Sequence, residues 1–73
     1  MLASRSGWFL MKRLYEVIEA IEQHKEYLFV AWPLVNGQFG IDVLDYEHEE
    51  RLDGGIFDNV DQAIEWLNEN YVR

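Results

Sequence analysis

Apolar residues recur at every third or fourth position near the start of the chain, with charged residues between them. This spacing is typical of a helix with one buried side. The apolar stripe consists of Leu10, Leu14, Val17, Ile18 and Ile21. It predicts a helix over residues 8–24, at the start of a single domain that covers residues 8–73. Residues 1–7 do not continue the stripe, and we expect them to form a disordered N-terminal extension.

The next segment predicts a β-hairpin. Residues 26–35 are rich in aromatic and β-branched side chains, and the Asn36-Gly37 pair that follows is a strong signal for a two-residue turn. Such a turn pairs Val35 with Gln38 and thereby sets the register of the two strands. In that register one face is almost wholly apolar, and we expect it to form the core. This face carries Leu28, Val30, Trp32, Leu34, Phe39, Ile41 and Val43.

The opposite face of the predicted hairpin is mixed in character. It is polar near the turn and aromatic at its far end. The aromatic end carries Tyr27, Phe29, Leu44 and Tyr46. Pro33 has no N–H to donate to a neighbouring strand, so we expect the first strand to lie at an edge of the sheet. The second strand is then central, with a third strand on its other side.

A third strand and a second helix follow. Residues 51–57 predict the strand, although Asp53-Gly54-Gly55 favours a bulge or a turn inside it. Asn59, with Gln62 three positions later, resembles a capping box at the start of a helix over residues 59–71. The buried stripe of that helix consists of Val60, Ala63, Ile64, Leu67 and Tyr71. The junction also resembles the strand-to-helix junctions of many small bacterial and phage-borne domains, a likeness that names no family.

These elements together predict an α+β fold in the order α-β-β-β-α. Three strands form an antiparallel meander, and the second helix packs on its apolar face. We expect the first helix on the same face. The sequence does not determine the side that this helix covers, and the opposite side remains an alternative.

Length and composition narrow the class of protein. The chain has 73 residues, no cysteine and an aromatic content of 15%, which together indicate a folded domain without disulfides in a reducing compartment such as the cytoplasm. No apolar run approaches the roughly 18 residues of a membrane span. A chain this short buries only about 60% of its surface on folding, so association with a second subunit is a common way to gain buried area.

The residue types argue against an enzyme. There is no cysteine or threonine, and the only serines, Ser4 and Ser6, fall in the expected extension, so no nucleophile is held rigidly beside a base. His48 lies among glutamates, which we interpret as a solvated acidic turn and not as a metal site. His24 falls at the end of the first predicted helix, where the helix dipole favours a cation. The sequence contains no glycine-rich phosphate loop. We therefore expect no catalytic residues, no metal and no cofactor.

Acidic residues supply the first candidate surface. Most of the net charge of −8 follows residue 25, a distribution that repels phosphate backbones and disfavours direct nucleic-acid binding. Carboxylates spread over a strand and a helix can instead imitate phosphates and attract a basic protein. The candidate interface residues are Asp42, Asp45, Glu47, Glu49, Glu50, Asp58, Asp61, Glu65 and Glu69. The alternative is that the acidity serves only solubility.

Aromatic residues supply the second candidate surface, because exposed aromatic side chains beside apolar ones mark interfaces. Its members are Tyr27, Phe29, Leu44, Tyr46 and Trp66. The alternative is that the first helix covers this face and turns it into a second small core.

The sequence thus predicts a small acidic interaction protein of bacterial or mobile-element type, cytoplasmic and without enzymatic activity. It would bind a protein partner, or itself as a homodimer, and its acidity would mask a basic nucleic-acid-binding surface. The alternative is a structural or accessory subunit, or a homodimer, that is held through the aromatic sheet face. In that case the acidity has no role beyond solubility.

Overall fold

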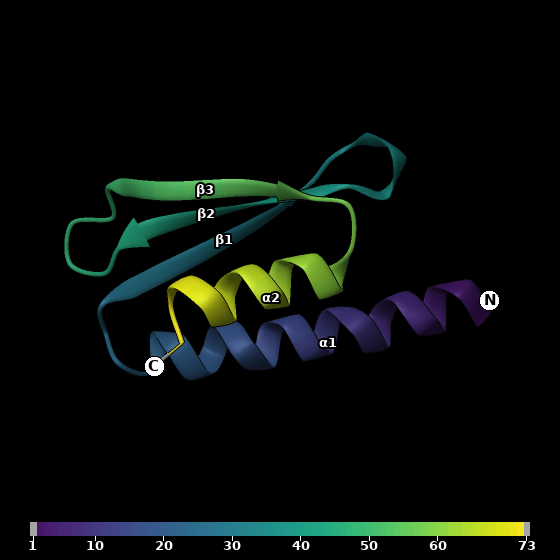
Figure 1. The fold of residues 1–73 in the computed structure, drawn as a ribbon, viewed down its shortest axis with the longest axis horizontal. Coiled ribbons are helices and arrows are strands. Elements are labelled where there is room, and N and C mark those ends of the chain that lie inside the picture. The colour runs from purple at the N-terminus through teal and green to yellow at the C-terminus, as the bar shows by residue number, and fades with distance from the viewer. Residues whose placement is uncertain (1, 73) are drawn as a thin grey trace.

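A computed structural model describes the backbone of residues 2–72 and the side chains of residues 11–72. The order of the elements is α-β-β-β-α, which confirms the predicted α+β fold (Figure 1). The helices and strands are α1 (Leu2–Glu22), β1 (Tyr27–Pro33), β2 (Phe39–Asp45), β3 (Arg51–Phe57) and α2 (Val60–Asn70), and a short 3-10 turn, η1 (Val35–Gly37), connects β1 to β2.

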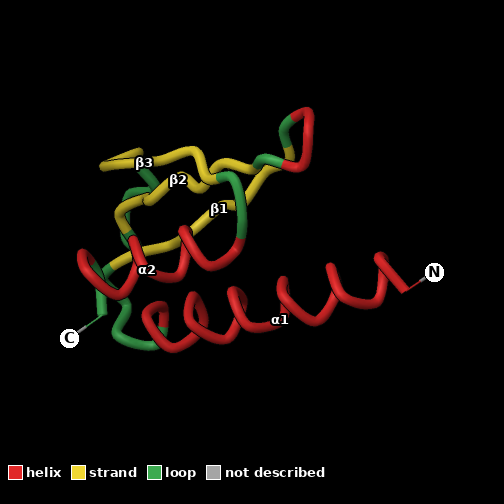
Figure 2. The backbone as a smooth tube through the Cα atoms, turned by 45° about the vertical axis from the view of Figure 1, so that its right-hand side comes forward, coloured by secondary structure: helices red, strands yellow, loops and turns green. Residues whose placement is uncertain are grey.

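The strands form one antiparallel sheet in the order β1-β2-β3, so β2 is central and β1, with Pro33, is an edge strand as predicted. Both helices lie on the same side of this sheet (Figures 1 and 2). Helix α1 packs against β1 and α2, and α2 packs against β3 as well. Within residues 2–72 the other side of the sheet carries no helix, which gives this part of the molecule two layers.

Helix α1 is longer than its predicted range of residues 8–24. It begins at Leu2, so the extension expected to be disordered over residues 1–7 has a helical backbone from Leu2 onward, while Met1 lies outside the described residues. This segment contains no proline that would interrupt a helix. The helix ends early because Lys25 has a φ of 60°, a left-handed conformation typical of helix ends. Within residues 2–72, neither helix has the length and apolarity needed to cross a membrane.

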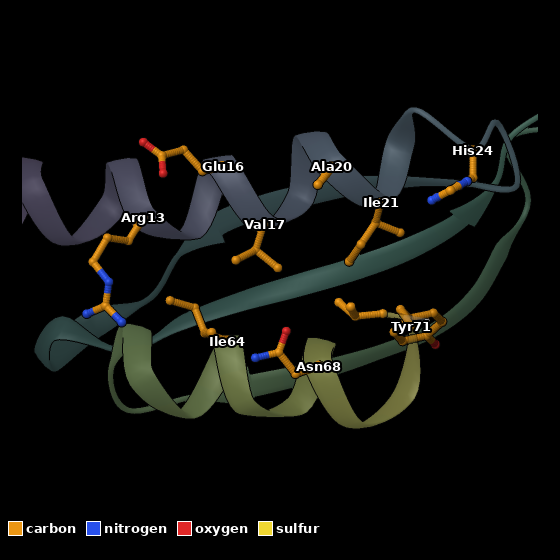
Figure 3. Close-up of a pocket in the computed structure, with 10 residues that line it drawn as sticks. Arg13, Glu16, Val17, Ala20, Ile21, His24, Ile64, Asn68 and Tyr71 are labelled. Carbon is orange, nitrogen blue, oxygen red and sulfur yellow. The ribbon is translucent and has the colours of Figure 1, made fainter.

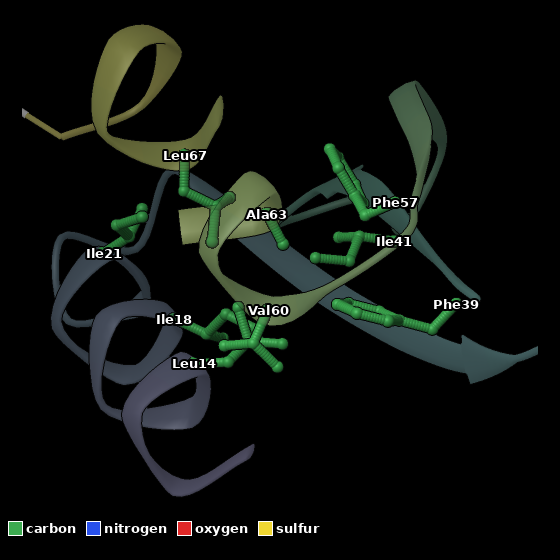
Figure 4. Close-up of a cluster of buried hydrophobic side chains, with 9 residues drawn as sticks. All are labelled: Leu14, Ile18, Ile21, Phe39, Ile41, Phe57, Val60, Ala63 and Leu67. Atoms are coloured by element: carbon green, nitrogen blue, oxygen red, sulfur yellow. The ribbon is translucent and has the colours of Figure 1, made fainter. Parts of the chain in front are cut away.

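The core lies between the helices and the sheet, and the predicted stripes supply most of it (Figure 4). Leu14, Ile41 and Leu67 are completely buried, one from each of α1, β2 and α2. The other core residues are Ile18, Ile21, Phe39, Val43, Phe57, Val60 and Ala63. The side chain of Leu10, which the sequence also placed in the stripe, lies outside the described residues.

The predicted register of the β1–β2 hairpin is wrong by one residue. Phe29 pairs with Val43, and Val30 pairs with Asp42. Side chains alternate between the two faces of a strand, so the shift reverses the faces of β1 while those of β2 remain as expected. Phe29 packs against the core, whereas Val30 is 47% exposed on the opposite side. Leu28 and Trp32, also expected in the core, share that opposite side with Val30.

One extra residue in the turn causes this shift. Asn36 and Gly37 have φ values of 61° and 78°, and the Gln38 N–H donates to the Val35 carbonyl at 3.3 Å, as in the predicted tight turn. The Leu34 N–H, however, also donates to Gln38, at 2.9 Å to its carbonyl oxygen. Leu34 and Val35 therefore oppose one residue, which is the geometry of a β-bulge. Val35 is 76% exposed at this bulge.

Strand β3 has the predicted range, and it contains a bulge. Leu44 pairs with Arg51 and Val43 pairs with Asp53, so Leu52 has no counterpart on β2. The glycines continue the strand without a turn. A Cβ atom on Gly55 would lie 2.8 Å from the ring of Phe57, so the absence of a side chain at Gly55 makes room for this core aromatic.

The start of α2 agrees with the sequence. The side chain of Asn59 accepts a hydrogen bond from the Gln62 N–H at 2.9 Å, and the Gln62 side chain accepts one from the Asp58 N–H at 3.0 Å. These bonds satisfy donors at a helix N-terminus that would otherwise lack partners. They direct α2 back across the sheet.

We predict that Leu14→Ala lowers the free energy of unfolding by about 2–4 kcal/mol, because it leaves a cavity between α1 and the sheet. The matched control is Glu19→Ala on the exposed side of the same helix, for which we expect a change within about 0.5 kcal/mol. Urea denaturation followed by circular dichroism measures both variants. Equal values for the two variants would contradict the docking of α1.

Candidate functional site

The side of the sheet opposite α1 and α2 presents a continuous surface, which we call the open face. It is formed by the side chains that alternate with the core residues along the strands. Its residues are Leu28, Val30 and Trp32 from β1, Gly40, Asp42 and Leu44 from β2, and Arg51, Gly54 and Ile56 from β3. Val30 and Ile56 are 47% and 61% exposed, which is high for apolar side chains in a sheet.

Two glycines flatten the open face. A Cβ atom on Gly40 would lie 2.3 Å from the ring of Trp32, so this indole lies directly over the glycine of the neighbouring strand. In the same way, a Cβ atom on Gly54 would lie 2.4 Å from the guanidinium of Arg51. Both long side chains therefore lie along the sheet and do not project from it.

The open face is electrically neutral in a strongly acidic chain. Among its nine strand residues the ionisable ones are Asp42 and Arg51, which form an ion pair with 3.1 Å between Asp42 Oδ1 and Arg51 Nε. The Arg51 side chain is 63% exposed, so water screens the pair and its contribution to stability is small. Trp32 and Ile56 join the pair in lining a shallow depression of about 420 Å³.

The predicted aromatic surface is divided between the two sides of the sheet. Tyr27 and Phe29 face the helices, where both contact the Tyr71 ring edge-on with centroid distances of 5.1 and 5.7 Å. Trp66 also belongs to this layer and packs 5.4 Å from the Tyr71 ring. Leu44 lies on the open face, and Tyr46 follows β2 in the turn. The register shift explains the division, and the expected second small core describes the part beneath the helices.

A hydrogen bond connects this aromatic layer to β3. The Tyr71 hydroxyl donates to Asp53 at 2.5 Å, close to the end of α2. This bond, followed by one from the Gly54 N–H, lowers the pKa of the Asp53 carboxyl. Burial, followed by the same bond to Asp53, raises the pKa of Tyr71 far above its usual value. The pair anchors the C-terminal end of α2 to the sheet.

The predicted acidic residues do not form one surface. Asp42 lies on the open face, and a second group occupies the β2–β3 turn, where Asp45 accepts hydrogen bonds from the His48 backbone at 3.0 Å and from its ring at 2.6 Å. The side-chain bond from His48 is the main cause that lowers the pKa of Asp45. The exposed members of this turn are Glu47, Glu49 and Glu50. His48 thus orders the turn, in agreement with its interpretation as part of a solvated segment.

The third group of acidic residues lies at and along α2. Asp58 accepts a hydrogen bond from Gln38 at 2.6 Å, and Asp61 pairs with Arg13 of α1 at 3.3 Å. Glu65 and Glu69 are exposed, and neither has an ion-pair partner within residues 11–72.

A groove of about 500 Å³ runs between the two helices (Figure 3). Val17, Ile21 and Ile64 give it an apolar floor, while Arg13 and His24 lie at its rim. Within the described part of the chain, no group of three or more His, Asp or Glu residues could hold a metal ion. The groove therefore offers apolar contact without a set of groups arranged for chemistry.

The fold and the open face define a class of protein: a small, acidic α+β domain in which α1 and α2 share one side of a three-stranded sheet. Over residues 10–73 the chain matches a protein family that is described by a bacteriophage T4 protein, and it belongs to that phage family.

A relative from Enterobacteria phage T4 supports the same assignment. It is described as an uncharacterized 7.9 kDa protein in the cd-pseT intergenic region, and it is 52% identical over 63 residues, which cover 86% of this chain and 96% of the relative. No solved structure matches the chain. The phage relative agrees with the predicted mobile-element type, while its description assigns no activity.

We predict that Tyr71→Phe reduces the loss of stability on acidification. The folded pKa of Asp53 lies below its ordinary value of 3.8, so its contribution is present above about pH 4 and is lost as the pH falls through the folded value. Removing the hydroxyl returns this pKa toward the ordinary value and keeps the ring. Urea denaturation at pH 7 and pH 3 measures the difference, with Tyr15→Phe as a control. Equal acid sensitivity of Tyr71→Phe and the wild type would contradict the role of this bond.

Proposed function

We propose that this protein acts by binding another protein chain through its open face, and not by catalysis. The observation that supports the proposal is a flat, neutral sheet face with exposed apolar side chains in a chain whose net charge is −8. Interface centres are depleted in charge and enriched in aromatic residues, and Trp32 supplies the aromatic component here. The family assignment is compatible with this function and leaves the partner open.

The energetic argument concerns apolar surface that the fold itself leaves in water. Covering Val30 and Ile56 removes apolar area that contributes about 25 cal/mol per Å² when buried. A domain of this size has a small core, so the contribution is large in proportion. The flattened positions of Trp32 and Arg51 lower the entropic cost of docking, because both side chains are already ordered by contact with the sheet.

The neutrality of this face also determines how binding responds to salt. The acidic groups lie in the β2–β3 turn and along α2, while the open face contains one balanced ion pair. Contact with this face is therefore selected by shape and apolar area, and we expect it to persist at high ionic strength.

We predict that the double substitution Val30→Lys and Ile56→Lys abolishes association while the protein remains folded. Tagged protein is recovered from phage-infected bacterial cells after a high-salt wash, and its self-association is measured separately by sedimentation velocity. The matched control is Glu65→Lys with Glu69→Lys, which adds the same number of lysines on α2 and should retain association. If the wild type neither self-associates nor retains a chain that the double variant loses, the proposal is wrong.

A second candidate function rests on the acidic side of α2. Glu65 and Glu69 are spaced by one helical turn, about 6 Å along the axis, and have no ion-pair partner within residues 11–72. Such a row of carboxylates attracts a basic protein, whose nucleic-acid-binding surface it would then mask. The expected compartment for both functions is the cytoplasm.

We predict that this second type of binding disappears when Asp61, Glu65 and Glu69 are all replaced by lysine. Charge reversal converts attraction into repulsion, so a basic partner retained at low salt should be lost, and the wild type should also release it at high salt. The open-face double variant serves as the control and should still retain that partner. Retention by the triple variant would exclude the acidic side of α2 as the binding surface.

A further inference from the structure

We propose that the occupant of the open face is a second copy of this chain, which forms a symmetric dimer with the two sheets packed face to face. This inference rests on the proposed function and names the partner. The helices of both copies would form the outer layers, and the two sheets the inner ones, as in a β-sandwich whose sheets lie about 10 Å apart.

The arrangement of charge on the face favours a second copy over an unrelated chain. Asp42 projects from β2, and Arg51 from β3 lies over Gly54 beside it. A two-fold axis that runs parallel to the strands, between β2 and β3, places Asp42 of each copy opposite Arg51 of the other. The four side chains then alternate in sign. An axis across the strands would instead place like charges opposite each other, so the pair also selects the orientation.

The apolar residues fit the same axis. Trp32, Gly40 and Ile56 form one row across the three strands. The axis places Ile56, which is 61% exposed, over the Gly40 position of the second copy, where the Trp32 ring lies flat. A projecting aliphatic side chain thus meets a flat aromatic surface at both symmetric positions. Self-complementarity of this kind is the requirement for a two-fold interface.

Association through the free edge of β1 is less favourable than association through the face. The Phe29 N–H already donates to the Glu22 carboxylate at 3.0 Å, and Pro33 has no N–H. These two features obstruct the addition of a strand along this edge. The open face is more accessible, because the long side chains of Trp32 and Arg51 lie flat on it.

The size of the face sets the expected strength of the dimer. Three strands of seven residues cover about 15 Å by 23 Å, or roughly 350 Å² per copy before side chains at the rim are included. Stable complexes bury about 800 Å² per partner. We therefore expect a dissociation constant in the micromolar range or weaker, so self-association has to be measured up to high protein concentration.

The test exchanges the two charges separately. Asp42→Arg gives a face with two positive charges, and Arg51→Asp gives one with two negative charges. Each variant alone should self-associate at least about tenfold more weakly than the wild type, because like charges meet at the axis. An equimolar mixture of the two should form a heterodimer of nearly wild-type affinity. Sedimentation velocity and native mass spectrometry measure association, and circular dichroism verifies the fold.

Two further variants keep the test decisive. Glu65→Arg makes the same type of change on the exposed side of α2 and should leave the dimer intact. Ile56→Lys removes the central apolar contact without altering the ion pair, so it should yield a folded monomer even if a charge variant fails to fold.

The outcomes separate this inference from the proposed function. Loss of self-association in both charge variants, with recovery in the mixture, supports the face-to-face dimer. A wild type that stays monomeric into the millimolar range overturns it, and so does a mixture that remains monomeric while both variants are folded. In either of those cases, a different chain that is retained by the wild type and lost in the Val30→Lys, Ile56→Lys variant still supports binding through the open face.

Discussion

The β-bulge at Val35 is the constraint on which the rest of this structure depends. Two hydrogen bonds at the hairpin place Leu34 and Val35 opposite Gln38, and every pairing between β1 and β2 follows from them. Because a strand alternates its faces, this extra residue decides that Phe29 packs beneath the helices and that Val30 lies on the open face. A tight turn without the bulge would exchange the two sets.

The core shows why this register is favourable. The helices bring their own aliphatic stripes, and the space beneath them also receives three aromatic rings, those of Tyr27, Phe29 and Tyr71, in edge-on contact. Such contacts stabilise beyond the area they bury. The hydrogen bond from Tyr71 to Asp53 then fastens the end of α2 to β3. The covered side of the sheet is thereby complete.

The same register leaves apolar side chains on the open face. Evolution toward solubility alone would favour polar residues there, yet the face combines Val30, Ile56 and Trp32 with a single balanced ion pair. The acidic groups are directed elsewhere, to the β2–β3 turn and the exposed side of α2. The molecule therefore separates a charged exterior, which keeps it dispersed, from a neutral face that is suited to contact.

The sequence by itself determined the element order, the range of β3, the helix stripes and the cap at Asn59, because each depends on neighbours within a few positions. It did not determine the face of β1, since both sides of that strand are apolar and either could fill a core. The aromatic surface was predicted from the wrong register, and Trp32 and Ile56 were consequently missed as candidates. Only the tertiary structure decided these points, because the bulge is stabilised by the packing of distant aromatic residues and not by the turn sequence.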